Sequence, residues 1–142
     1  MARIQLELPE RFLFSTEIPV LALHLNFTGH LDNAMVLAMV SEARIRFWQS
    51  LGQDPVDVHG VTLMAVDAAV QYRSQAHHGE VMVVEKAARD FHPRGLDLVW
   101  RLSERQSGRE VARGKTGLLC VDLASGQVST LPEPLRDQLL AL

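Results

Sequence analysis

The stretch NAMVLAMVSEARIRFWQSL, residues 33–51, decides the fold of this chain. It contains no glycine or proline, Asp32 or Asn33 can cap its first amides, and Gly52 follows as a helix-terminating residue. Residues 34–40 are apolar on every side, a pattern that a surface helix would not tolerate. The stretch therefore predicts one long helix that other parts of the chain wrap.

The segments around this helix predict β-strands. A mostly apolar run at residues 18–25 precedes it and ends in a turn-forming group. Four further strands, separated by short polar turns, are predicted at residues 62–72, 81–88, 96–102 and 111–123. In residues 62–72 the even-numbered positions are the apolar ones, so we expect them to form the buried face. Residues 132–142 predict a short amphipathic C-terminal helix.

This order of elements predicts a single α+β domain over residues 1–142, in which a five-stranded antiparallel sheet wraps the long helix. The last four strands are expected to form a meander. With 47% hydrophobic and 22% charged residues the chain is not of the disordered class. The longest apolar run, residues 34–40, is too short to span a membrane, and the N-terminus resembles no targeting segment. We therefore expect a cytoplasmic protein.

Charge and single residues narrow the function classes further. A net charge of -3 argues against a general nucleic-acid binder. Residues 86–115 nevertheless hold eight basic and four acidic side chains, which either bind a small polyanion or simply decorate solvent-exposed faces. The single cysteine, Cys120, is expected in the core. Adjacent His77 and His78 are disfavoured as metal ligands because neighbouring side chains in a turn point to opposite sides, so no metal site is expected.

One segment and the order of elements together carry a family resemblance. The segment is NFTGHLDNA at residues 26–34, followed by EAR at residues 42–44 and then by Phe47, Leu51 and Gly52. It resembles the hot-dog-fold acyl-CoA thioesterases related to 4-hydroxybenzoyl-CoA thioesterase. The resemblance implies hydrolysis of an acyl-CoA or acyl-carrier-protein thioester by a homodimer or homotetramer. No cofactor is implied beyond the coenzyme A of the substrate.

The chain departs from this family at the residue that matters most for catalysis. Those thioesterases place an aspartate, acting as nucleophile or base, where this chain has Asn26, and an amide can do neither. We expect Asn26 to position a water molecule while another group takes the proton. His30 and Glu42 are the main candidates for that group, with His24 and Asp32 nearby.

Each of these residues also has a structural interpretation. Asn26 can be a simple turn residue, and His30 and Asp32 can be helix-entry groups that satisfy free amides. Glu42 can pair with Arg46 on the helix surface.

Substrate-binding residues are expected at the start of the helix and in the basic region. Gly29 lets a ligand approach the backbone, and together with Asp32 and Asn33 it is expected to bind the substrate and the developing oxyanion. The phosphates of coenzyme A are assigned to three arginines of the basic region, Arg89, Arg94 and Arg113.

Two other functions are known on the same fold. A non-hydrolytic acyl-CoA-binding protein is the main alternative, because a fold alone does not fix function. A hot-dog dehydratase is disfavoured, since the Pro-Gly-rich stretch that follows its catalytic histidine is missing after His92-Pro93.

Overall fold

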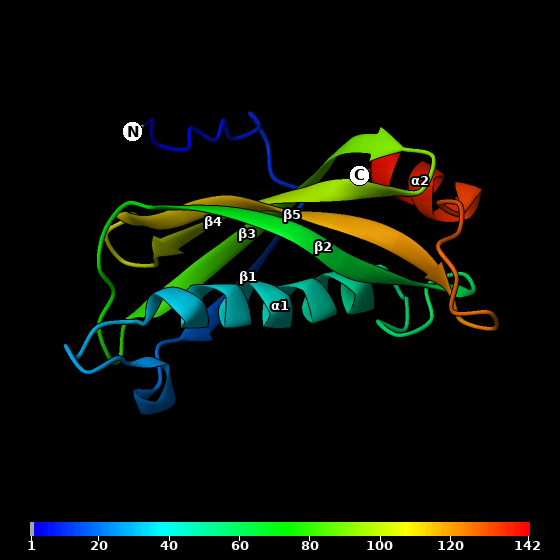
Figure 1. Ribbon diagram of the computed structural model, residues 1–142. Coiled ribbons are helices and arrows are strands. Elements are labelled where there is room, and N and C mark those ends of the chain that lie inside the picture. Colours follow the sequence, from blue (N-terminus) through cyan, green and yellow to red (C-terminus); the bar gives the residue numbers. More distant parts are fainter. Residues whose placement is uncertain (1) are drawn as a thin grey trace.

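The computed structural model describes residues 2–142 and contains one antiparallel sheet with a long helix on one of its faces (Figure 1). The strands are β1 (Phe14–Pro19), β2 (Val61–Tyr72), β3 (Val81–His92), β4 (Gly95–Glu104) and β5 (Glu110–Asp122). The helices are a 3₁₀ turn η1 (Ala22–His24), α1 (Asn33–Ser50) and α2 (Glu133–Leu140). The predicted five-stranded sheet, long helix and short C-terminal helix are confirmed.

The strand order is β1-β3-β4-β5-β2, so the predicted four-strand meander is wrong for β2. Only β3, β4 and β5 follow one another as hairpins, whereas β2 pairs with β5 at the far edge of the sheet. Residues 73–80 connect β2 to β3 across the end of the sheet, where the Leu31 N–H donates to the Ala76 carbonyl at 2.8 Å. A connection of this length reaches about 26 Å when extended, enough to cross the roughly 14 Å between these two strands.

The first strand lies earlier in the chain than predicted. Instead of spanning residues 18–25, β1 ends at Pro19, and the chain turns through η1 before it reaches α1. The turn is held by the imidazole of His24, whose Nδ1 accepts from the Leu21 N–H at 2.9 Å. His24 and Asn26 both lie outside β1, so the expectation from the alternation of a strand, that the two side chains share one strand face, is wrong.

The predicted buried face of β2 is also wrong over half of its length, because a β-bulge interrupts the strand between Ala65 and Asp67. Before the bulge Val61 and Leu63 are buried, while Met64 is exposed; after it Val70 packs against the core. The Asp67 carboxylate accepts the Gly117 N–H at 3.1 Å and occupies the space where a side chain on Gly117 would lie. The bulge shifts the alternation by one residue, which a strict period of two cannot predict.

The sheet buries one side of α1 rather than surrounding it. Val36, Val40, Ala43 and Phe47 face the sheet and are almost fully buried, whereas Ala34 and Ala38, among others, are exposed. The prediction of a helix wrapped on all sides therefore does not hold within one chain. Two apolar clusters fill the space between helix and sheet, one around Met39 and Trp100 and the other around Phe47 and Leu118.

Lys86, in the middle of β3, lies inside the core. It pairs across the sheet with Phe14 and Trp100, and its Nζ is the one buried side-chain nitrogen or oxygen in residues 2–142 without a hydrogen-bond partner. Burial, helped by the nearby positive charge of Arg44, lowers the pKa of Lys86 to about 7. The lysine is therefore an uncompensated polar group in an otherwise apolar interior.

The two ends of the chain complete the domain. Leu135 and Leu139 of α2 join the Phe47 cluster and close the end of the core next to the C-terminus of α1. The N-terminal segment crosses the sheet opposite α1 (Figure 1), and Arg113 donates to its Leu6 carbonyl at 3.1 Å. Cys120 is fully buried, which confirms its expected core position, and burial raises the pKa of its thiol to about 11. No helix within residues 2–142 has the length and apolar character needed to cross a bilayer.

Candidate functional site

The segment between η1 and α1 forms a chain of three hydrogen-bonded side chains. The Asn26 carboxamide oxygen accepts from the backbone N–H of Thr28 at 2.9 Å and lies 2.5 Å from the Thr28 hydroxyl. That hydroxyl oxygen is in turn 2.9 Å from Nδ1 of His30. Asn26 is therefore a turn residue, as its structural interpretation predicted, and it is also linked to the histidine.

The protons in this chain can be assigned from donor and acceptor rules. A backbone N–H can only donate, so the Asn26 atom that faces Thr28 is the oxygen Oδ1. The Thr28 hydroxyl must then give its single proton to Asn26, and its own oxygen is left to accept from His30. His30 consequently carries its proton on Nδ1, and the lone pair on Nε2 is available to accept a proton.

The N-terminus of α1 follows directly. Asp32 is the N-cap residue, and its carboxylate accepts from the Ala34 N–H at 3.0 Å. The Met35 and Val36 amides donate to the Asp32 carbonyl, so in residues 2–142 the Asn33 amide is the first-turn N–H without a partner. Of the three predicted oxyanion-site residues, Asn33 thus offers a free donor, while Asp32 caps the helix.

Gly29 lies at the open tip of the same turn. Its φ of 82° lies in the left-handed region that favours glycine, and a Cβ built on it would meet nothing within 4 Å. Its own N–H donates to the Asn26 carbonyl at 3.0 Å. Gly29 therefore leaves space for a ligand beside the turn but has no free amide to offer it.

A groove of about 400 Å³ runs between α1 and the β1–η1 segment. Its walls are mainly apolar and include Ile18, Leu21 and Met39, and His24 also lines it. Farther along α1, Glu42 and Arg46 also line the groove, and they form an ion pair at 3.1 Å.

Glu42 therefore does not join the Asn26–His30 chain. It lies about 14 Å along the helix from Asn33, given a rise of 1.5 Å per residue. Arg46 also donates to the Thr16 hydroxyl and the Glu17 carbonyl, so the pair ties α1 to β1.

The structure places two further residues beside His30 that the sequence did not assign to the site. His77, from the β2–β3 connection, lies against His30 with the ring centroids 5.1 Å apart and the rings at 74°. Glu80 accepts from the His77 N–H at 2.7 Å, and its carboxylate also lies 3.2 Å from Nδ1 of His77. In the sequence, the one feature that marks this position as a candidate site is the adjacent pair His77-His78. That pair by itself indicates at most a metal site.

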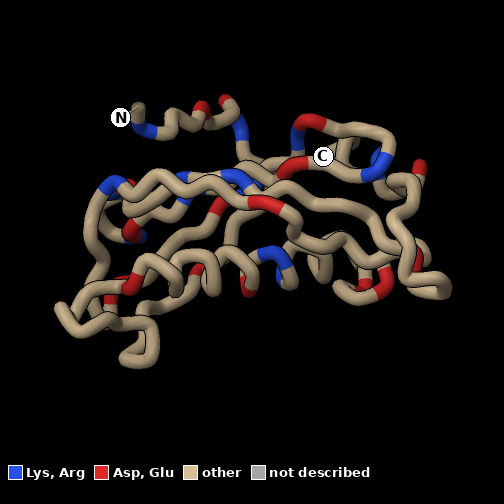
Figure 2. The backbone as a smooth tube through the Cα atoms, in the orientation of Figure 1, with Lys and Arg blue, Asp and Glu red and all other residues tan. Residues whose placement is uncertain are grey.

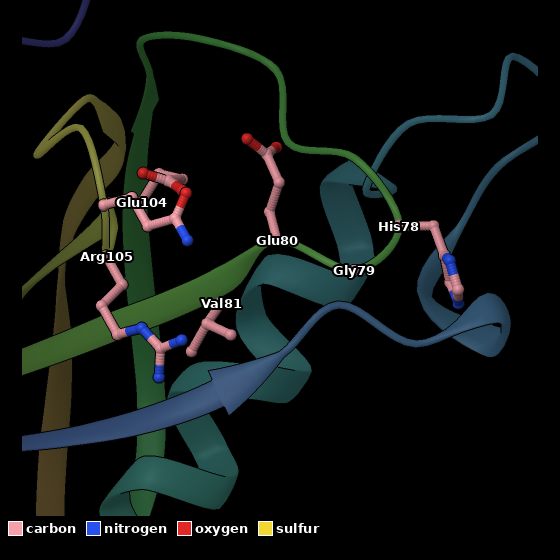
Figure 3. Close-up of a pocket in the computed structure, with 7 residues that line it drawn as sticks. His78, Gly79, Glu80, Val81, Glu104 and Arg105 are labelled. Carbon is pink, nitrogen blue, oxygen red and sulfur yellow. The ribbon is translucent and has the colours of Figure 1, made fainter.

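A second hollow, of about 340 Å³, lies beside the turn at residues 77–80 (Figure 3). It is lined by residues 78–81 and 104–106. Figure 3 shows His78 pointing away from the carboxylates of Glu80 and Glu104. With two carboxylates and one arginine, Arg105, in its walls, this hollow does not favour the polyphosphate of coenzyme A.

The three arginines assigned to the coenzyme A phosphates do not gather at the site within one chain. Arg89 lies near the end of β3, and Arg94 lies in the turn after it, both far along the strand from the Glu80 turn. Arg113 pairs with Glu110 at 2.9 Å and supports the N-terminal segment. Basic and acidic positions are interspersed along the sheet (Figure 2), so their assignment to phosphate stays a prediction.

Comparison with known proteins places this geometry in context. A family model described as the thioesterase-like superfamily matches residues 20–139. The long-chain acyl-CoA thioesterase FadM of Escherichia coli (strain K12) is 23% identical over 128 residues, which cover 87% of this chain and 95% of that protein.

Solved structures share the fold over nearly the whole chain. A 1,4-dihydroxy-2-naphthoyl-CoA thioesterase from Synechocystis has a TM-score of 0.81 at 21% identity, covering 91% of this chain and 96% of its own. A Staphylococcus aureus protein solved in complex with CoA also has a TM-score of 0.81, at 17% identity, covering 96% of this chain and 87% of its own.

Proposed function

Since the chain belongs to the thioesterase-like superfamily, we propose that it hydrolyses acyl-CoA thioesters with a water molecule held at the start of α1, beside Asn26 and His30. The match confirms the hot-dog fold and the thioesterase class that the sequence predicted. The observation that carries the proposed mechanism is the Asn26–Thr28–His30 chain. Through this chain, Asn26, at the position of the family's carboxylate, is linked to a histidine with a fixed tautomer.

In this mechanism Asn26 acts through its oxygen. By accepting from Thr28 it orients the hydroxyl, and the hydroxyl orients His30, whose Nε2 accepts a hydrogen bond from the water. The water attacks the thioester carbonyl, and the Asn33 N–H stabilises the oxyanion that develops there. Gly29 leaves room for the thioester to reach this position.

The acyl group is assigned to the groove between α1 and β1. Its volume of about 400 Å³ falls within the usual range of ligand pockets, and its walls are mainly apolar. The groove begins at His24, whose carbonyl accepts from the Asp32 N–H at 2.8 Å, next to the N-cap of α1. The Glu42–Arg46 pair lines the part of the groove farther along α1, so in this proposal Glu42 lies beside the acyl chain rather than taking a proton.

The test is a hydrolysis screen with the purified protein. Release of free thiol is followed across acyl-CoAs of increasing chain length and across hydroxybenzoyl-CoAs, with acyl-carrier-protein thioesters as a second donor. We expect turnover that depends on the acyl group, because the groove has a limited volume and mainly apolar walls. A protein that binds acyl-CoA without releasing thiol from any of them would support the non-hydrolytic alternative and contradict this function.

We also propose that the active form is a homo-oligomer built on the β2 edge of the sheet. β2 is an edge strand, and the apolar side chains of Met64 and Val66 on it are 52% and 57% exposed. An unpaired strand edge with exposed apolar side chains favours pairing with a second copy. Such pairing would continue the sheet from one chain into the next.

Sedimentation velocity at micromolar concentration checks this prediction. The molecular mass of the wild type should be twice the 15.8 kDa of one chain, as for a dimer, or four times that mass, as for a tetramer. Met64→Glu should shift the population toward the monomer, because a carboxylate would be buried at the new interface. Val56→Glu, an equally apolar and exposed position outside the strands, should leave the mass unchanged. A stable wild-type monomer would contradict the proposal.

A further inference from the structure

His77 is brought to the site by backbone pairing rather than by proximity in sequence. Residues 30 and 77 form an isolated antiparallel bridge, and the Leu31 N–H donates to the Ala76 carbonyl at 2.8 Å. This bridge joins the β2–β3 connection to the segment that precedes α1. It places the His77 ring edge-to-face with His30, which ends the Asn26–Thr28–His30 chain.

Glu80 holds His77 from the opposite side. The chain reverses at Gly79, whose φ is 86°, and Glu80 returns to accept the His77 N–H and face its Nδ1. Arg109 donates to both carboxylate oxygens of Glu80 at 3.1 Å, and it also reaches the Ser74 hydroxyl and the Gln75 carbonyl. Glu80 and Arg109 therefore hold the turn at residues 77–80 in place.

The carboxylate of Glu80 stays ionised in this setting. Partial burial works to raise its pKa, but the hydrogen bonds from the His77 N–H and from Arg109 outweigh it, so the net pKa lies below the ordinary value. An ionised carboxylate can only accept hydrogen bonds. Nδ1 of His77 must therefore donate to Glu80, and Nε2 of His77 keeps its lone pair.

Two histidines with fixed tautomers thus lie side by side, but they differ in the group to which the Nδ1 side of each ring is linked. The chain behind His30 ends on the neutral amide of Asn26, whereas His77 is backed by a negative charge. An imidazole that has taken a proton is stabilised by an adjacent carboxylate and not by an amide. Of the two, His77 is the one with a carboxylate against its ring.

We propose that His77 is the general base of this thioesterase and that Glu80 and Arg109 are its positioning residues. This inference rests on the proposed function. Nε2 of His77 takes a proton from the water while the water oxygen bonds to the thioester carbonyl carbon. The carbon–sulfur bond then breaks, and the proton on His77 passes to the sulfur of coenzyme A, leaving a free acid and a thiol. The carboxylate that the family holds at the Asn26 position is thus replaced by a histidine–glutamate pair from the β2–β3 connection.

The pH profile of kcat is the readout that separates a base from a structural residue. The charged and titratable groups around His77 are His30 from the segment before α1, Glu80 from the β2–β3 connection and Arg109 from the β4–β5 turn. The wild-type kcat should fall at low pH, because a base that already carries a proton cannot take one from the water. In His77→Asn this fall at low pH should disappear, and kcat should be reduced on the order of 10²–10⁴-fold.

Three further variants complete the experiment, each measured on the best substrate of the thiol-release screen. His30→Asn should lower kcat, but its kcat should still fall at low pH as in the wild type. Glu80→Gln should lower kcat by at least about tenfold, with partial recovery in Glu80→Asp, because a neutral amide no longer stabilises the imidazolium. Free imidazole should restore part of the activity of His77→Ala, since the His77 side chain is 55% exposed.

His59→Asn is the matched control. His59 lies in the loop before β2 with a φ of 54°, a conformation that asparagine tolerates, and it should keep wild-type activity. Wild-type kcat in folded His77→Asn or in Glu80→Gln would overturn the inference and leave the proposed function standing. A wild type inactive on every thioester would overturn both.

Discussion

In equilibrium unfolding at pH 7, Lys86→Met is expected to be more stable than the wild type by on the order of 2 kcal/mol. The Nζ of Lys86 is fully buried without a hydrogen-bond partner, and burial lowers its pKa to about 7. Methionine has a similar length and no charge to desolvate, so it should fill the same space between the two apolar clusters.

The pH dependence gives this prediction a second, independent signature. In the unfolded chain Lys86 titrates near 10.4, so between about pH 7 and 10 the unfolded state binds more protons than the folded state. The free energy of unfolding contributed by Lys86 therefore rises with pH across this window, and the advantage of Lys86→Met should shrink accordingly.

Urea titrations at pH 7 and pH 9 measure both effects. Lys115→Met is the matched control, because Lys115 forms ion pairs with Asp67 and Asp97 and its pKa is raised, mainly by the hydrogen bond to Asp67. That variant should be no more stable than the wild type. A Lys86→Met protein that is less stable than the wild type at pH 7 would show that Lys86 has a partner that favours its charged form.

The second large effect is expected at Asn26, where Asn26→Ala should lower kcat on the order of 10²–10³-fold. The substitution removes the acceptor of the Thr28 hydroxyl proton, so that hydroxyl is free to donate to Nδ1 of His30 instead. His30 would then shift its own proton to Nε2 and could no longer accept from water. Affinity for acyl-CoA should change little, because the chain acts on the water and not on the bound substrate.

Thr28→Val tests whether Asn26 and His30 act through the hydroxyl between them. Valine has nearly the same shape as threonine but can neither accept from His30 nor donate to Asn26. Its loss of kcat should match that of Asn26→Ala, and the double variant should be no worse than either, as expected for residues that act as one unit. Additive losses in the double variant would show that Asn26 and Thr28 act separately.

Sequence patterns sufficed for the helix and the sheet because both rest on local chemistry. The uninterrupted run of residues 33–51 and the capping residue Asp32 are features of neighbouring residues, and α1 begins and ends within a residue of the prediction. The alternation in residues 81–123 likewise predicted β3, β4 and β5 correctly. Those signals do not depend on which strand lies next to which.

The errors in strand order, in the buried face of β2 and at His77 depend on contacts between distant parts of the chain. The bulge in β2 exists because Asp67 fits against Gly117, fifty residues away, and no local pattern carries that information. The same holds for the placement of β2 beside β5. His77 was missed as a site residue for this reason, since it reaches His30 only through a connection that crosses the sheet.

The candidate site was predictable in part. The resemblance identified the turn with Asn26, Gly29 and His30, and the structure shows these residues in one hydrogen-bonded turn. It could not show that Asn26 contacts Thr28 rather than an open water site, because the direction of a side chain in a turn is set by its own hydrogen bonds. Glu42 was expected beside them from its position on the helix, but its ion pair with Arg46 holds it at the far end of the groove.

The central claim, that Asn26 acts through its oxygen to orient His30, is tested most directly by the kcat of Asn26→Asp on the best acyl-CoA substrate at neutral pH. Aspartate keeps an oxygen acceptor for the Thr28 N–H and hydroxyl but lacks the NH₂ group of asparagine. The account predicts a kcat equal to or above that of the wild type, because the chain stays intact and gains a negative charge behind the imidazole. A kcat as low as that of Asn26→Ala would contradict it and assign the function of Asn26 to its NH₂ group.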